Sequence, residues 1–170
     1  MYITLKIILG IAVVICSTQI GILLSKKYVY RLDELDEMKN NFQIIENKIK
    51  YTYEPLEDIF SEIAEISSFS VKEVFLKTSQ NIKRKGAEMA WKDEIKESDL
   101  SLKKEDKNIL KEFGNLLGKT NKEGQVNQIQ FVNTLLDRQI EKAKEEKSKN
   151  ETVYKKLGLI FGIGIVIVLI

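Results

Sequence analysis

The sequence predicts an all-α protein in which a six-helix cytoplasmic bundle is flanked by N- and C-terminal transmembrane helices. One proline and nine glycines in 170 residues suit long helices and not a turn-rich β fold. Both ends are strongly apolar, and the middle carries apolar residues at helical spacing. The expected parts are an anchor at 1–25, a helical domain at 26–152 and a short anchor at 153–170, with the terminal helices of the bundle continuous with the anchors.

The first apolar segment, residues 2–24, carries a single charge, Lys6. As a helix it would span about 34 Å, enough for a bilayer core of about 30 Å. A cleaved signal peptide is the alternative interpretation. Branched residues rather than small ones precede Cys16, so an uncleaved anchor is favoured.

The last apolar segment, residues 157–170, has no charge. Its helix would be about 21 Å long, and adding residues 153–156 with snorkelling lysines extends it to about 27 Å. Gly158 and Gly162 form a Gly-x-x-x-Gly pair that can pack closely on another membrane helix, the alternative being ordinary glycines of a membrane helix.

The expected orientation follows from the lysines and arginines beside the two spans. Lys26, Lys27 and Arg31 follow the first span, and six lysines lie between positions 142 and 156, whereas the outer ends offer only Lys6. The central domain is therefore expected in the cytoplasm with both termini outward. Lysines next to the bilayer can also contact anionic lipid.

The first span is expected to continue as one helix to about Lys50, since apolar residues recur every three or four positions. This stripe consists of Leu32, Leu35, Met38, Phe42, Ile45 and Ile49. The string "YTYEP" then breaks the helix, and Pro55 suits the first turn of the next one. The apolar face of this second helix is Leu56, Ile59, Phe60 and Ile63.

Three further helices are expected before the last. Ser70 and Glu73 have capping-box spacing, so the third helix is predicted to start at Val71 and to end near Gly86. The fourth covers about 87–97, where Trp91 is interpreted as a core anchor, with a partner-binding hot spot as the alternative. Its other apolar positions are Met89 and Ile95. The fifth runs from about 102 to 117.

The last helix is expected to begin near position 121 with one apolar face. The face consists of Val126, Ile129, Val132, Leu136, Ile140 and Ala143. Residues 141–151 are polar on nearly every side, which favours a solvated helical stalk leading to the second anchor; a disordered linker is the alternative.

The composition argues against most catalytic chemistry. There is no histidine and only one cysteine, which removes His-based acid–base catalysis and the usual zinc ligand sets. The 27 basic and 25 acidic residues leave a net charge of only +2, unlike a nucleic-acid binder with a large positive field. No cofactor, metal, nucleic acid or small-molecule substrate is expected.

One string resembles a nucleotide-binding phosphate loop, Gly118-Lys119-Thr120. Such a loop needs four residues between its first glycine and the Gly-Lys pair, and it follows a strand. Here only three residues separate Gly114 from Gly118, Phe113 stands at the required position, and an amphipathic helix precedes the string. A nucleotide-binding loop is therefore not predicted.

A corner between two helices fits the same residues. Gly118 can end the fifth helix in the left-handed conformation. Thr120 and Glu123 have the spacing of a capping box for the sixth helix. Gly114 would then lie inside the fifth helix, where close approach of another helix explains a glycine.

The string "LKKEDKNILKEFGNLLGKTNKEGQ" resembles the stage III sporulation protein AB family of endospore-forming bacteria. The matching positions are Leu102, Asp106, Leu110, Phe113, Gly114, Leu117, Gly118 and Gln125. Tyr51, Pro55 and Leu56 match a second family segment, and the ending "YKKLGLIFGIGIVIVLI" matches a third. The sequence departs from the family at Glu54, where threonine is common, and at Asn121, where aspartate is usual.

The resemblance implies a non-catalytic membrane platform or scaffold subunit of a secretion-like complex that crosses the envelope between mother cell and forespore. The family is similar in its helical domain to the inner-membrane platform protein, the F component, of type II secretion. The implied partners are the sporulation ATPase of the same operon and other stage III sporulation membrane proteins. The implied location is the mother-cell membrane around the forespore.

A generic membrane-tethered coiled-coil adaptor or sensor is the alternative function. Such a protein would consist of two or three long helices, whereas this chain has at least four internal joints. The candidate partner-facing residues are Lys83, Arg84, Lys85 and Trp91, with Tyr51 and Tyr53 as further exposed aromatics. Ordinary solvated surface is the alternative interpretation for the basic run and for the tyrosines.

Overall fold

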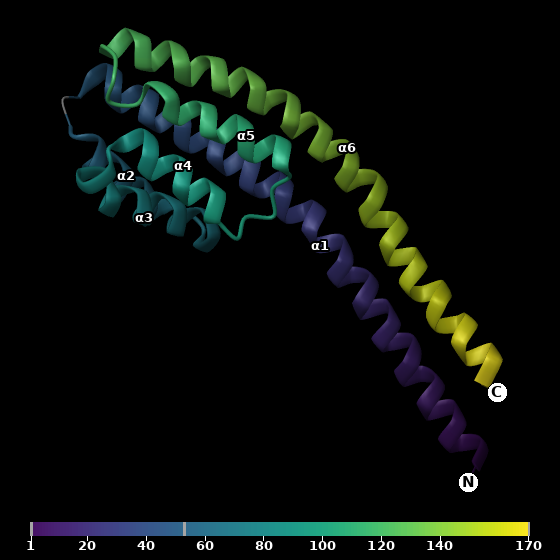
Figure 1. Cartoon of the computed structure of the whole chain (residues 1–170). Coiled ribbons are helices and arrows are strands. Elements are labelled where there is room, and N and C mark those ends of the chain that lie inside the picture. Colours follow the sequence, from purple (N-terminus) through teal and green to yellow (C-terminus); the bar gives the residue numbers. More distant parts are fainter. Residues whose placement is uncertain (1, 53, 170) are drawn as a thin grey trace. The chain divides into compact units, whose positions relative to one another are not determined.

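The computed structural model describes the backbone of residues 2–52 and 54–169, with the side chains of residues 9–52, 54–115, 117–154 and 156–167. Within these residues the chain forms six α-helices and one short 3-10 helix, and no strand (Figure 1). The helices are α1 (Tyr2–Tyr51), α2 (Leu56–Ile66), α3 (Phe69–Lys85), α4 (Ala87–Glu97), α5 (Lys104–Phe113), η1 (Gly114–Leu116) and α6 (Lys122–Leu169). The all-helical prediction is confirmed, as is the continuity of the two terminal helices.

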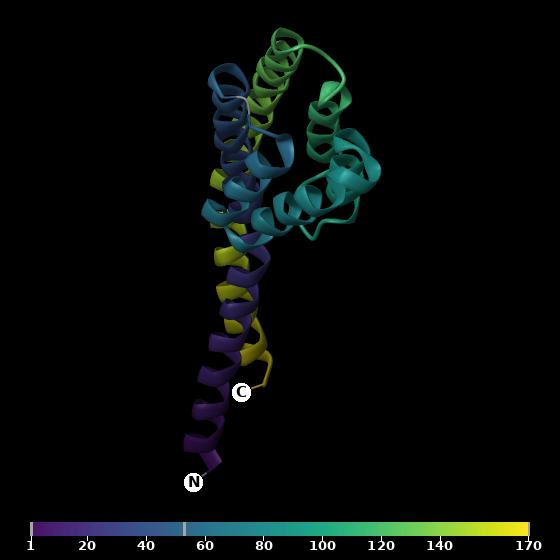
Figure 2. The ribbon, with the colours of Figure 1, turned by 90° about the vertical axis from the view of Figure 1, so that its left-hand side faces the viewer.

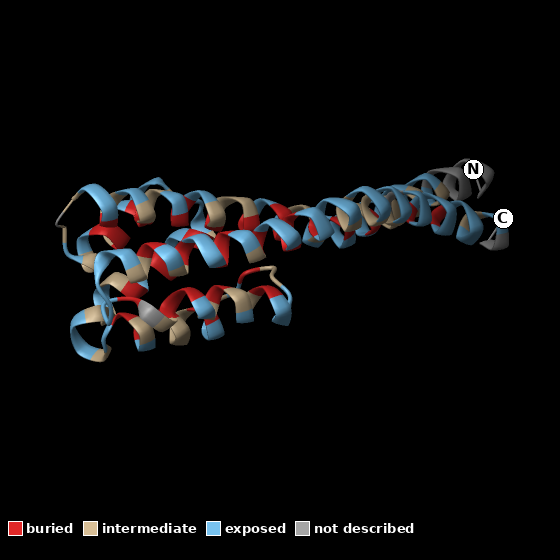
Figure 3. Ribbon diagram, turned by 90° about the horizontal axis from the view of Figure 1, so that it is seen from above, coloured by how far each residue is buried: buried red, intermediate tan, exposed pale blue. Residues whose placement is uncertain are grey.

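The chain divides into two compact units. Residues 33–141 form the helical bundle, and residues 1–32 with 142–170 form the terminal helix pair. In the bundle, α2–α5 lie together on one side of the bundle parts of α1 and α6 (Figure 2). Buried positions follow the inner faces of these helices (Figure 3).

The apolar stripes of the two long helices are buried as their spacing predicts. All six positions from Leu32 to Ile49 on α1, and all six from Val126 to Ala143 on α6, are at most 8% exposed. Across the bundle, Lys39 on α1 forms an ion pair with Asp137 on α6, and Gln130 donates to Glu46 at 2.7 Å. The stripes supply the apolar packing, and the polar pairs lie at its edge.

The centre of the bundle is a cluster of five aromatic rings, one from each of the first five helices. They are Phe42, Phe60, Phe75, Trp91 and Phe113, all at most 1% exposed. The Phe42 and Phe113 rings stack with centroids 3.9 Å apart, and Trp91 meets all four phenylalanines at 5.1–5.8 Å. Since each helix contributes one ring, the cluster joins α1–α5 in one core.

Several predicted boundaries are confirmed. Gly86 separates α3 from α4 at φ 79°, and its N–H donates to the carbonyl of Ile82 at 2.8 Å. The α4 helix covers 87–97 as expected, with Trp91 and Ile95 buried. Residues 141–151 are helical throughout, so the helical form of the predicted stalk is confirmed and the disordered linker is wrong.

The predicted start of α3 is wrong by two residues. The helix begins at Phe69 with Ser68 at its N-cap, so Ser70 and Glu73 form no capping box. Ser68 instead turns to α1, where its N–H and hydroxyl donate to the two carboxylate oxygens of Glu37 at 2.6 and 2.5 Å. A long-range carboxylate thus replaces the local cap that the spacing suggested.

Three further expectations need correction. The fifth helix ends at Phe113 and tightens into η1, so Gly114 lies at its end and not inside it. Met89, which the sequence groups with Trp91 and Ile95 as an apolar position of α4, is 58% exposed and not part of the core. Pro55 stands at the N-cap of α2 and not within its first turn.

The terminal helix pair packs backbone against backbone. A Cβ built on Gly158 would lie 2.8 Å from the carbonyl oxygen of Ser17, and one on Gly162 would lie 2.9 Å from the Cα of Val14. The Ser17 hydroxyl donates to the Gly158 carbonyl at 2.6 Å. The glycine pair is therefore a close-packing face, and the helix it packs on is α1 of the same chain.

Of the described residues, one helix, α1, is long and apolar enough to cross a membrane, and little of its apolar stretch is buried within the chain. In the described part of the terminal pair, most residues are exposed (Figure 3). Large apolar side chains on this exposed surface include Leu9, Ile15, Leu23, Ile160, Phe161 and Ile167.

Candidate interaction surfaces

The string that resembled a phosphate loop forms a corner between η1 and α6. Gly118 has φ 70°, as a left-handed helix-ending glycine should, and its N–H donates to the Gln125 side chain at 3.2 Å. The Gln125 amide donates in turn to the carbonyl of Thr120 at 3.1 Å. Glutamine and glycine of the family motif therefore hold the turn closed.

The cap of α6 is Asn121 and not Thr120. The Asn121 side-chain oxygen accepts the N–H of Gly124 at 2.9 Å, three residues on, and its carbonyl accepts the N–H of Gln125. The predicted Thr120–Glu123 capping box is wrong by one position. Glu123 lies in the first turn, where a carboxylate favours the positive end of the helix dipole.

Lys119, the lysine of the apparent nucleotide motif, is paired with a carboxylate. It forms an ion pair with Glu88 on α4, and Lys92 contacts the same carboxylate at 2.5 Å. Hydrogen bonds from Lys119 and Lys92 lower the pKa of Glu88 to about 2. The Lys119–Glu88 ion pair thus links the corner between η1 and α6 to α4.

Position 114 must be glycine because the side chain of Trp91 leaves no room for a Cβ atom there. A Cβ on Gly114 would lie 2.9 Å from Cδ1 of Trp91 and 3.5 Å from the carbonyl of Glu88. The indole N–H of Trp91 donates to the carbonyl of Leu110 at 2.6 Å. A close approach does require the glycine, but the neighbour is a tryptophan side chain as well as helix backbone. Phe113, the residue before it, belongs to the aromatic cluster.

The two family segments that are distant in sequence meet in the bundle. Leu56 at the start of α2 lies 3.7 Å from a Cβ built on Gly118, and Lys122 donates to the carbonyl of Thr52 at 3.3 Å. Leu117 is buried and Tyr51 is 80% exposed. Tyr53 lies outside the described residues. The segment at 51–56 and the corner at 113–125 therefore form one end of the bundle.

Glu54, where the chain departs from the family pattern, is also engaged. Its carboxylate pairs with Lys48 at 2.7 Å, and Lys48 contacts Glu62 on α2 at 2.6 Å. These carboxylates raise the pKa of Lys48, chiefly through the hydrogen bond that Lys48 donates to Glu54. Ion pairs of Lys48 with Glu54 and Glu62 thus connect α1 to α2, where the family pattern has a threonine cap.

The basic run at the end of α3 is largely paired within the bundle. Lys83 contacts Glu57 at 2.9 Å, Arg84 donates to Asn81 at 2.9 Å, and Lys85 contacts Asp93 at 2.5 Å. Trp91 is fully buried in the aromatic cluster. The core interpretation of Trp91 is confirmed, and its place among partner-facing residues is wrong because no part of its side chain reaches the surface.

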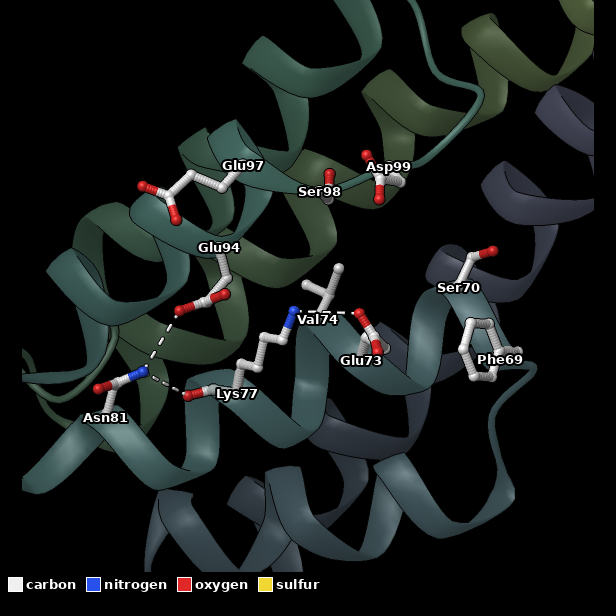
Figure 4. Close-up of a pocket in the computed structure, with 10 residues that line it drawn as sticks. All are labelled: Phe69, Ser70, Glu73, Val74, Lys77, Asn81, Glu94, Glu97, Ser98 and Asp99. Carbon is white, nitrogen blue, oxygen red and sulfur yellow. Dashed lines mark hydrogen bonds and ion pairs between the residues drawn. The ribbon is translucent and has the colours of Figure 1, made fainter.

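A groove of about 360 Å³ between α3 and α4 was not anticipated from the sequence (Figure 4). Lys77 pairs with Glu73 at 3.0 Å inside it, and Asn81 reaches Glu94 at 3.3 Å. Phe69 lies at one end and is 79% exposed. Four carboxylates line the groove: Glu73, Glu94, Glu97 and Asp99. Its charge pattern suits a basic partner segment with an apolar residue.

Among the described residues, no three His, Cys, Asp or Glu side chains gather as metal ligands would. Cys16, the single cysteine, is exposed on the apolar part of α1. The class defined by the fold is an all-helical bundle whose first helix can cross a membrane.

The comparisons with known proteins identify the family. The family model for stage III sporulation protein AB matches residues 6–170, so the chain belongs to the stage III sporulation protein AB family. Stage III sporulation protein AB of Bacillus subtilis (strain 168) is 28% identical over 169 residues, 97% of this chain and 99% of that protein. A solved structure of stage III sporulation protein AB (SpoIIIAB) has a TM-score of 0.67 at 26% identity and covers 71% of this chain and 98% of its own.

Proposed function

We propose that this protein is a non-catalytic platform subunit of a secretion-like complex between mother cell and forespore. Its two terminal helices anchor it in the mother-cell membrane around the forespore, with both termini outward. Its helical bundle lies in the cytoplasm and docks a secretion-type sporulation ATPase of the same operon. Other stage III sporulation membrane proteins are its further partners.

The observation that carries this proposal is the close glycine contact in the terminal helix pair. Without a hydrophobic driving force in lipid, membrane helices associate by van der Waals packing of small residues and by hydrogen bonds. The contacts of Gly158 and Gly162 with α1, together with the Ser17–Gly158 hydrogen bond, have this character. They support a two-helix anchor that includes the short C-terminal segment.

The shape of the bundle favours a platform over a coiled-coil adaptor. Helices α2–α5 are 10 to 17 residues long and converge on one aromatic cluster. An adaptor built from two or three long helices would not contain these four short helices. A compact bundle presents joints and grooves to a partner, and the groove between α3 and α4 is the docking surface that we propose for the ATPase.

Co-purification of the full chain with the ATPase tests the proposal. Both proteins are co-expressed and extracted in mild detergent, and the ATPase bound to the tagged chain is quantified at several salt concentrations. We expect stable co-purification, because the groove offers both charge and an exposed aromatic side chain. Absence of the complex at every salt concentration would argue against the platform role.

Matched variants then locate the docking surface. Glu94→Lys with Glu97→Lys reverses two charges in the groove, and Arg84→Glu reverses one on the basic edge at the end of α3. We expect the groove variant to lose the ATPase and the edge variant to retain it. The opposite result would assign docking to the basic edge and leave the platform role intact.

A further inference from the structure

The terminal helix pair contains an apolar cleft of about 320 Å³. Ile20 and Leu24 of α1 form one wall, and Leu157, Phe161 and Ile165 of α6 form the other. Gly21 and Gly158 also line it, and the close contact of their backbones brings the two helices together there. The part of α6 that borders the cleft, residues 154–165, is about 16 Å long.

One end of this cleft carries a cation held by two aromatic rings. The ammonium of Lys27 lies 5.0 Å from the ring centroid of Tyr28 and 5.8 Å from that of Tyr154, which itself lines the cleft. The two tyrosine rings stack with centroids 5.8 Å apart. Cation–π contacts of this kind position an ammonium without neutralising it.

Lys27 forms no ion pair with any carboxylate among the residues that the structure describes. Arg31, one turn further along α1, is different, because it is buried and contacts Glu146 at 2.8 Å. An exposed, positioned and unneutralised ammonium therefore stands where an otherwise apolar cleft ends. This arrangement complements an anionic headgroup attached to a hydrocarbon chain.

We propose that the cleft binds one acyl chain of an anionic phospholipid whose phosphate pairs with Lys27. The inference rests on the proposed membrane insertion of both terminal helices. The acyl chain lies along Leu24, Leu157 and Phe161, and Tyr28 and Tyr154 lie at the level of the headgroup, where tyrosines are favoured in membranes. The protein thereby selects lipids by charge at one defined place.

A third membrane helix fits this cleft less well than a lipid. Close helix packing needs small residues that let backbones approach. The small residues here are already used between α1 and α6, as a Cβ on Gly21 would lie 2.5 Å from the carbonyl oxygen of Tyr154. The walls that remain are large, branched or aromatic side chains, and a thin and flexible acyl chain can lie against them.

Lipid retention by the full chain tests the proposal. The protein is reconstituted in nanodiscs of phosphatidylcholine with phosphatidylglycerol and extracted in mild detergent, and the retained lipid is quantified by mass spectrometry. We expect retained phosphatidylglycerol to exceed its share of the mixture. Lys27→Gln should lower this retention about fivefold, the effect of one lysine near an anionic surface. Lys26→Gln, which removes the neighbouring exposed lysine, should lower it less than Lys27→Gln does, since it is the Lys27 ammonium that lies over the two tyrosine rings at the end of the cleft.

A second pair of variants tests the acyl-chain part of the site. Leu24→Trp adds bulk to a wall of the cleft, and Leu23→Trp adds the same bulk to an adjacent exposed position outside it. We expect loss of retained phosphatidylglycerol in the first and retention in the second. Equal loss in Lys26→Gln and Lys27→Gln, or equal retention of both lipids by the unmodified chain, would overturn the proposal.

Alkaline extraction separates failure of this inference from failure of the proposed function. A chain that stays in the membrane at alkaline pH but shows no lipid preference contradicts only the lipid site. A chain that is released into the supernatant contradicts the two-helix anchor, and the lipid site with it.

Discussion

The helical bundle and the terminal helix pair solve the same packing problem with opposite kinds of residue. The bundle fills its centre with five aromatic rings, one from each of α1–α5. The terminal pair brings helices together through glycine and serine, with carbonyl oxygens within 3 Å of the positions that Cβ atoms would occupy. In water, burying large apolar side chains drives association, whereas in lipid that driving force is absent and close contact is what remains. The difference is what we expect if only one of the two units lies in a membrane.

The two units also treat buried charge differently. In the terminal pair, buried Arg31 is neutralised by Glu146. In the bundle, buried Glu34 accepts the N–H of Ser101 at 2.7 Å. Burial raises the pKa of Glu34 to about 7, with Glu37 and Asp33 adding to the rise and the Ser101 N–H and Lys107 opposing it. Buried Arg31 is therefore tolerated by pairing, and buried Glu34 by favouring its neutral form.

Trp91→Ala should have the largest effect, because it removes the ring that meets four others at the centre of the bundle. We expect a loss of about 3–5 kcal/mol in the free energy of unfolding. The measurement is denaturant unfolding of the full chain in detergent, followed by circular dichroism. Phe69→Ala is the control, since this exposed ring should contribute less than about 0.5 kcal/mol. Equal losses would mean that the aromatic cluster does not hold the bundle.

Glu34→Gln should remove a pH dependence of the bundle. The folded-state pKa of about 7 lies above the usual value of 4.5. The folded chain therefore holds a proton that the unfolded chain releases, and the free energy of unfolding falls as the pH rises between these values. The fall is up to about 3 kcal/mol, after which it levels off. Unfolding midpoints from pH 4 to 8 check this, and an unchanged slope in Glu34→Gln would contradict it.

Gly158→Leu should separate the helices of the terminal pair. Its Cβ would meet the carbonyl of Ser17 at 2.8 Å, and overpacking of this kind costs about 1–3 kcal/mol. Spin labels at positions 23 and 157, both exposed, report the distance between the two helices. The distance should lengthen in Gly158→Leu and stay unchanged in Gly164→Leu, where nothing lies within 4 Å. No change in either variant would show that the glycine contact is not formed.

Asn121→Ala should have the smallest effect, about 1 kcal/mol, from loss of the cap of α6. The Asn121 side chain accepts the N–H of Gly124, whereas Thr120 takes part in the corner through its carbonyl. Thr120→Ala should therefore be nearly neutral in the same unfolding assay. A larger loss of unfolding free energy in Thr120→Ala than in Asn121→Ala would show that Thr120 is the cap of α6, as the sequence suggested.

Some of these features could be predicted from the sequence and others could not, for physical reasons. The stripes on α1 and α6 were predictable because a helical period determines which face is buried. Gly86 and Gly118 were predictable because a positive φ favours glycine. The cap was missed because Thr120 and Asn121 are both good N-caps in consecutive positions, and spacing alone cannot choose between them.

Contacts between helices could not be predicted from the sequence for a different reason. Periodicity placed Phe42 and Phe60 on inner faces but could not say that their rings meet those of the other helices, because this depends on how the helices cross. The groove between α3 and α4, and the Ser68–Glu37 hydrogen bonds that replace a local cap, depend on the same crossing. The family segments at 51–56 and 113–125 could be named in advance, but their meeting at one end of the bundle could not.

Topology mapping tests the central claim, a cytoplasmic bundle held by two membrane anchors, most directly. In a Cys16→Ser background, a single cysteine is placed in turn at each terminus and at position 69, on the exposed surface of the bundle. The chain is expressed in non-sporulating cells, where its membrane faces the medium, and intact spheroplasts of these cells are treated with a membrane-impermeant thiol reagent. The account predicts labelling of both termini in intact spheroplasts and labelling of position 69 only after lysis. Labelling of position 69 before lysis, or protection of the C-terminus, would contradict it.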